Sequence, residues 1–140
     1  MAKIKFGTSG WRAILGEDFT FRHVRIVCQA IAQVLRQDKV AQQGVIIGHD
    51  SRFLGEQFAR AAAEVFAAHG IPVLLCDRET PTPAISYHIL HHQLAGGINI
   101  SASHNPPEWN GIKFTPSWGG AALPETTQAI EQRIVPLMHG

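Results

Sequence analysis

One stretch of the sequence places several chemically capable side chains within a few residues of one another. Residues 101–110 form a polar segment after a short apolar run, and they include Ser103, His104 and Asn105 in succession. Pro106 and Pro107 follow directly and stiffen the backbone, which lowers the entropy lost when the preceding side chains are held in one geometry. A hydroxyl presented on a rigid loop is what nucleophilic catalysis requires. The residue types alone fit a functional site and a capping loop equally well.

Two further segments are polar and glycine-flanked. Residues 7–12 read Gly-Thr-Ser-Gly-Trp-Arg, and residues 48–52 read Gly-His-Asp-Ser-Arg. Both fall where we expect loops. The guanidinium of Arg12 offers paired donors that match phosphate oxygens, although Arg12 could also form an ordinary surface ion pair.

Hydrophobic periodicity predicts the elements that must position these segments. Thr20 can cap the first helix, Gly70 can end the second, and Thr82 with Pro83 suits the start of the third. Strands alternating with helices predict a three-layer α/β/α sandwich with a mostly parallel, mixed sheet, formed by residues 1–140 as one domain. Ligand sites in such sheets lie outside the carboxyl ends of strands, which is where residues 101–110 fall. The predicted helices are 21–36, 54–69, 83–92 and 124–137, and the predicted strands are 45–47, 71–76, 97–100 and 111–115.

The composition narrows the class of protein. Hydrophobic residues make up 45% of the 140 residues and charged residues 16%, which supports a buried core. The formal charge is +1 and the basic residues are scattered, so we expect neither a nucleic-acid partner nor a membrane partner. The two cysteines, Cys28 and Cys76, lie in apolar stretches and are expected to be buried free thiols. Without a signal-peptide pattern at the N-terminus, we expect a cytoplasmic protein.

Three motifs together resemble one enzyme family. Residues 101–106 (Ser-Ala-Ser-His-Asn-Pro), followed by residues 110–113 (Asn-Gly-Ile-Lys), resemble the phosphoserine loop of the α-D-phosphohexomutases, a superfamily that includes phosphoglucomutase, phosphomannomutase and phosphoglucosamine mutase. Residues 7–12 and 48–52 resemble two other loops of that superfamily, in the same order. The resemblance covers the whole chain but only the first of the family's four domains. It implies that residues 1–140 are domain I of a longer, four-domain enzyme, with the remaining domains as partners; a short natural homologue is the alternative.

The resemblance implies a role for each candidate residue. Ser103 would carry the phosphoryl group and, through that phosphate, contact Mg²⁺, whose other ligands would come from the second domain. Lys113 would be the general acid and base, and His104 would support the loop or take part in catalysis. The residues expected to bind phosphate or substrate are Arg12, Thr8, Ser9 and Asn105, and those expected to support the site are Asp50 and Arg52.

The implied reaction is reversible phosphoryl transfer on a hexose phosphate through a hexose 1,6-bisphosphate intermediate. Glucose and mannose phosphates are the expected substrates, with glucosamine phosphate as an alternative, and the 140 residues alone are expected to be inactive. A non-catalytic sugar-phosphate-binding module and a structural docking domain remain open as other functions. His88, His91 and His92 have a spacing that can bind zinc, but no acidic or cysteine partner accompanies them, so a solvated helix face is favoured.

Overall fold

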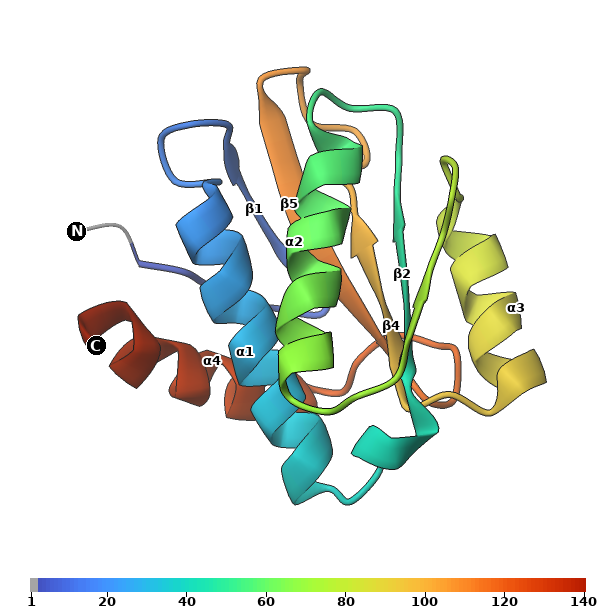
Figure 1. The fold of residues 1–140 in the computed structure, drawn as a ribbon. Coiled ribbons are helices and arrows are strands. Elements are labelled where there is room, and N and C mark those ends of the chain that lie inside the picture. Colours follow the sequence, from blue (N-terminus) through green and yellow to red (C-terminus); the bar gives the residue numbers. More distant parts are fainter. Residues whose placement is uncertain (1–2) are drawn as a thin grey trace.

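The structure, a computed structural model, describes residues 3–140 and contains one five-stranded sheet between helical layers (Figure 1). The strand order is β1-β5-β4-β2-β3. β2 pairs in parallel with β3 and β4, whereas β5 runs antiparallel to both β4 and β1. The strands are β1 (Trp11–Ile14), β2 (Val45–His49), β3 (Val73–Leu75), β4 (Gly96–Ile100) and β5 (Trp109–Pro116).

One face of the sheet carries the main core. Helices α1 (Phe21–Gln37) and α2 (Gly55–Ala68) pack side by side over it, and α4 (Pro124–His139) packs against α1. The Thr20 hydroxyl accepts a hydrogen bond from the His23 amide and begins α1, which confirms the predicted cap. Stacked and edge-on rings of Trp11, Phe19 and Phe58 fill the layer near the first strand.

On the other face, a single helix, α3 (Thr82–His92), covers β2 and β4. A short 3-10 turn (Ala41–Gln43) precedes β2. The core on this face is small and consists of Ile46, Ile85, Ile89 and Leu94. Helices therefore cover both faces, and the predicted three-layer α/β/α class with a mixed sheet is confirmed. β5 and β1 extend beyond α3 on this face.

The structure differs from the sequence predictions in several places. The third helix begins at Thr82 with Pro81 in the N-cap position, so the expectation that Thr82 caps this helix is wrong. β5 begins at Trp109 rather than at residue 111. Trp11 and Arg12, expected in a loop, lie in β1, where side chains alternate between buried and half-buried. The strand expected at 71–76 is only Val73–Leu75, because it forms the edge of the sheet. Both cysteines are free thiols, but only Cys28 is buried, whereas Cys76 is half-buried.

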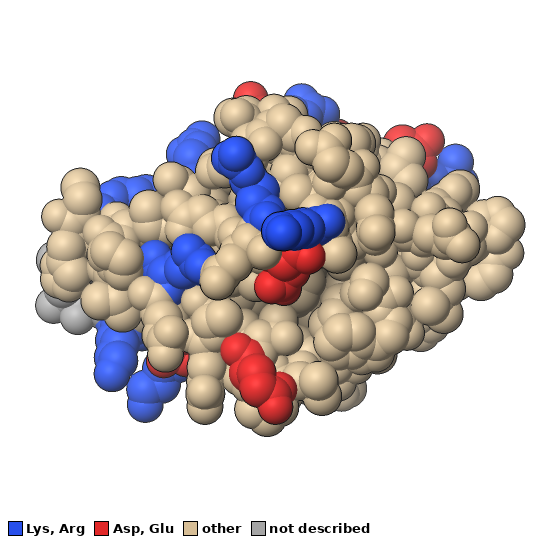
Figure 2. Space-filling model, turned by 90° about the horizontal axis from the view of Figure 1, so that it is seen from below, with Lys and Arg blue, Asp and Glu red and all other residues tan. Residues whose placement is uncertain are grey.

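Charged side chains are dispersed on the end of the molecule shown in Figure 2, which presents largely uncharged surface between them. The dispersion agrees with the near-neutral formal charge of +1. Among residues 3–140, no helix combines the length and hydrophobicity that a membrane crossing requires.

Candidate functional site

The loop after β4 holds Ser103 in a backbone conformation that serine rarely adopts. The φ angle of Ser103 is +53°, in the left-handed region, which costs a non-glycine residue about 1–3 kcal/mol. The Ser103 amide donates to Ser101 Oγ at 3.1 Å, and the Asn105 amide donates to the Ala102 carbonyl at 3.0 Å. Two local hydrogen bonds thus tighten the turn, while the Ser103 side chain stays exposed at the carboxyl end of β4.

Arg52 binds this loop through four backbone carbonyls. Its Nη1 donates to Pro106 O at 2.7 Å and to Trp109 O at 3.0 Å. Its Nη2 donates to Ser103 O at 2.9 Å and to Asn105 O at 2.6 Å. One rigid guanidinium therefore spans the loop from Ser103 to Trp109, which a flexible single ammonium could not do.

Asp50 holds Arg52 in place. Its carboxylate accepts from the Arg52 amide at 3.1 Å and lies 3.5 Å from Arg52 Nε. The Asp50 amide donates to Ile100 O at 3.1 Å, so the loop after β2 is joined to the end of β4. Between the two loops lies a hollow of about 420 Å³, lined by Asp50, Ser51, Arg52, Phe53, Ser103, Asn105 and Pro107.

Strand register brings Arg12 and Lys113 to one face of the sheet. Arg12 pairs with Gly111, and Lys113 follows two residues later in β5, so both side chains project from the face that α3 partly covers. A side chain at Gly111 would lie 2.8 Å from Arg12 Cγ and 2.7 Å from Ser101 O, so only glycine leaves room for Arg12 there. Arg12 Nη1 donates to Asn105 Oδ1 at 3.2 Å and so contacts the serine loop.

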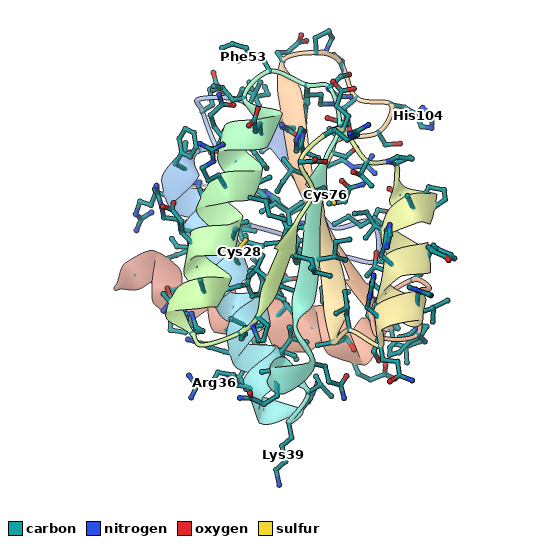
Figure 3. The ribbon with its side chains drawn as sticks, turned by 45° about the vertical axis from the view of Figure 1, so that its right-hand side comes forward. Cys28, Arg36, Lys39, Phe53, Cys76 and His104 are labelled. Atoms are coloured by element: carbon teal, nitrogen blue, oxygen red, sulfur yellow. The ribbon has the colours of Figure 1, made fainter. Side chains whose placement is uncertain are left out.

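The remaining predicted residues are more exposed. Thr8 and Ser9 lie in a tight turn closed by two hydrogen bonds between Gly7 and Gly10, and both are exposed. Figure 3 shows His104 at the same end of the sheet as Phe53, with its ring directed outward, whereas Arg36 and Lys39 lie at the opposite end. Within the described residues, neither His104 nor Lys113 forms a hydrogen bond through its side chain.

Carboxylate, imidazole and thiol groups are not clustered as a metal site in the part of the chain that the structure describes. Residues 3–140 contain no group of three or more His, Cys, Asp or Glu side chains arranged to hold a metal ion. The carboxylate beside the serine loop, Asp50, is paired with Arg52. The expectation that Mg²⁺ binds through a phosphate on Ser103 stays a prediction.

Sequence reasoning gave no role in the site to three residues, Ser101, Asn99 and Thr82, that form hydrogen bonds there. Ser101 fixes the Ser103 amide, and its position two residues earlier is the spacing of a serine turn, a signal visible in the sequence. The other two residues are Asn99 and Thr82, and Asn99 Nδ2 donates a hydrogen bond to Thr82 Oγ1 at 2.8 Å. That contact joins β4 to α3 and has no short-range sequence signal.

Comparison with known families identifies this arrangement. A family model described as phosphoglucomutase/phosphomannomutase, alpha/beta/alpha domain I, matches residues 3–136. The chain belongs to this family. The phosphoglucomutase/phosphomannomutase resemblance inferred from the three loops is thereby confirmed, and the match is to domain I.

Individual members of the phosphoglucomutase/phosphomannomutase family agree. A phosphoglucomutase of Staphylococcus saprophyticus is 36% identical over 94% of this chain and 24% of its own length. A phosphoglucosamine mutase of Acaryochloris marina is 41% identical over 92% of this chain and 28% of its own length. A solved structure from Thermus thermophilus, of a protein proposed to be a phosphomannomutase, superposes with a TM-score of 0.88 at 38% identity and covers 95% of this chain and 30% of that one. The chain thus spans about a quarter of the length of the curated relatives it matches.

Proposed function

We propose that the protein containing this chain is an α-D-phosphohexomutase that moves a phosphoryl group between the 1- and 6-positions of a hexose phosphate. The relatives named above are mutases, and phosphoglucomutase is among them. Ser103 is the proposed phosphoryl carrier, and a hexose 1,6-bisphosphate is the proposed intermediate. Glucose and mannose phosphates are the proposed substrates.

One observation carries this proposal: a serine in the left-handed conformation, with four loop carbonyls bound by Arg52, at the mouth of the sheet. The strain is maintained only because neighbouring contacts outweigh it. A loop that only capped the end of the sheet would not require an exposed serine hydroxyl in so constrained a conformation. Arg12, which contacts the loop through Asn105, supplies a guanidinium suited to phosphate.

The proposed transfer balances in atoms and charge. The free sugar hydroxyl attacks phosphorus, the bond between phosphorus and Ser103 Oγ breaks, and the new bond joins phosphorus to the sugar oxygen. Lys113, as the neutral amine, takes the hydroxyl proton as general base, and the ammonium so formed returns that proton as general acid to the departing Ser103 oxygen. After the bisphosphate has turned over in the site, the reverse sequence returns its other phosphoryl group to Ser103. Positioning and charge stabilisation account for most of the catalysis in such transfers.

Mg²⁺ is the proposed metal, and it would neutralise charge on the transferring group when bound. This chain would contribute only the phosphate oxygen on Ser103, and further domains of the same protein would supply the remaining ligands. We also propose a cytoplasmic location, for which the two free cysteines are the supporting feature.

The test is covalent phosphorylation of Ser103. The full-length protein is incubated with glucose 1,6-bisphosphate and Mg²⁺, and intact mass with peptide mapping locates the phosphoryl group. We expect one phosphoryl group on Ser103, none in Ser103→Ala, and mutase turnover only in the unsubstituted protein. Persistent absence of phosphate from Ser103, with intact sugar-phosphate binding, would instead identify a non-catalytic binding module.

The activities for which the relatives are named support substrate alternatives within the same chemistry. They include phosphoglucosamine mutase and, at 33% identity over 96% of this chain, a phosphopentomutase of Mus musculus. Competition among glucose, mannose, glucosamine and ribose phosphates for turnover by the full-length protein decides between them. A kcat/KM for another sugar phosphate that exceeds those for glucose and mannose phosphates would overturn the hexose assignment made here.

A further inference from the structure

The sheet face that carries Lys113 contains an unusual buried group, the side-chain amide of Asn99. Asn99 is 3% exposed and lies in β4 on the face that α3 covers. Its Nδ2 donates to Thr82 Oγ1 at 2.8 Å, which fixes the orientation of the amide. Its Oδ1 is buried and has no hydrogen-bond partner among residues 3–140. A buried acceptor without a donor is costly, so a native structure normally provides one.

Strand register indicates which side chain could donate a hydrogen bond to Asn99 Oδ1. Asn99 pairs directly with Lys113 across the antiparallel β4–β5 ladder. Directly opposite residues lie on the same face with Cβ atoms about 4.5–5.5 Å apart. The lysine side chain is half-buried and enters no ion pair within the described residues. Its ammonium has three donors and a flexible stem, which can turn back to the neighbouring strand.

We infer that Asn99 is a positioning residue for Lys113: Asn99 Oδ1 accepts a hydrogen bond from the Lys113 ammonium, and Thr82 orients the amide that offers it. The inference rests on the proposed function only in treating Lys113 as the proton carrier. If so, the first turn of α3, which contains Thr82, helps to fix the position of Lys113 Nζ between successive phosphoryl transfers.

The direct test observes the lysine ammonium groups by NMR in the 140-residue protein, without any need for activity. The chain has four lysines, of which Lys3, Lys5 and Lys39 are exposed, so the Lys113 signal can be assigned by its loss in Lys113→Met. We expect Lys113 to exchange its ammonium protons with water more slowly than the other three. In Asn99→Leu the exchange should accelerate about tenfold, the factor that corresponds to losing one hydrogen bond to a charged group.

Matched variants separate this effect from general disturbance of the sheet. Asn110 is also fully buried in β5 but lies on the opposite face, with Ile112 and Phe114, so Asn110→Leu should leave the Lys113 exchange rate within about twofold. Thr82→Val releases the amide and should reproduce part of the acceleration, whereas Asn99→Asp keeps an acceptor and should slow the exchange. These two variants carry the test if Asn99→Leu does not fold.

The inference is overturned if Lys113 exchanges as fast as the exposed lysines in the unsubstituted protein, or if Asn99→Asp and Thr82→Val both leave its exchange rate unchanged. In the full-length protein, Asn99→Leu should lower kcat about tenfold with KM within about twofold, which a general loss of folded protein would not produce. The two proposals fail separately. If Asn99→Leu abolishes the slow exchange of Lys113 but Ser103 is never phosphorylated, this inference stands and the mutase proposal is refuted. If Ser103 is phosphorylated but Asn99→Leu leaves the exchange of Lys113 unchanged, only this inference is refuted.

Discussion

The contact between Arg52 and the serine loop leads to the sharpest prediction. Arg52→Met removes four hydrogen bonds to loop carbonyls, at distances of 2.6–3.0 Å, while keeping much of the side chain's length. Hydrogen bonds from a charged donor contribute about 1.5–3 kcal/mol each when water is excluded. The loop is partly exposed, and its carbonyls can turn to water, so we expect the whole set to be worth about 2–3 kcal/mol.

That amount is comparable to the strain of about 1–3 kcal/mol at Ser103, so the loop should leave its left-handed turn when Arg52 is lost. Native-state hydrogen exchange measures this directly at the Asn105 amide, which donates to Ala102 O, and the Trp109 amide, which donates to Pro106 O. A loss of about 2 kcal/mol corresponds to exchange about 30-fold faster at these amides. Amides in the centre of β2 should change much less.

Two further variants test the geometry behind this expectation. Arg52→Lys keeps the charge but not the planar fork, so it should show most of the acceleration. Arg60→Met is the control, because Arg60 is 66% exposed and makes only an i,i+4 pair with Glu56, worth less than about 0.5 kcal/mol. Unchanged protection at Asn105 in Arg52→Met, or normal protection in Arg52→Lys, would refute the reasoning.

Three other predictions follow from the fold. Gly10→Ala should lower the free energy of unfolding, measured by chemical denaturation, by about 2 kcal/mol or more. The reason is that φ at Gly10 is +80° and the added methyl would collide with the Ile112 carbonyl. An unchanged unfolding midpoint would contradict the β1–β5 register. Phe19→Ala should cost about 3–5 kcal/mol, since its ring is fully buried within the aromatic cluster, and a loss below about 1 kcal/mol would show that the cluster is loosely packed. Burial raises the pKa of the Cys28 thiol, so alkylation at neutral pH should modify half-buried Cys76 first and reach Cys28 only on unfolding; equal rates in the native protein would exclude this burial.

The sequence was sufficient for much of the fold because its signals are local. The apolar stripe of α1 and the Thr20 hydroxyl define one helix without reference to any other element. The apolar run 45–47 is similarly self-contained and forms the first three residues of β2. Element ends were less well defined, as at the edge strand β3, because pairing partners rather than composition decide where an edge strand stops.

β1 was missed for a physical reason. Its four residues alternate in burial, but the preceding Gly-Thr-Ser-Gly segment has loop composition and the strand exists only because β5 pairs with it. The same reason limited the site. Ser103, Arg12 and Lys113 could be selected from motifs, whereas the four carbonyls bound by Arg52 and the Asn99–Thr82 contact depend on backbone positions that no side-chain pattern encodes.

The edge position of β1 affects when the protein can complete its fold during synthesis and how far its N-terminus can be shortened. β1 pairs with β5 alone, and the contact between Arg12 and Asn105 joins residues 93 positions apart. During synthesis, the amino-terminal segment must therefore wait until most of this domain has left the ribosome before it can find its partner. Trimming the first dozen residues would remove Arg12, the proposed phosphate contact, together with the first two residues of β1.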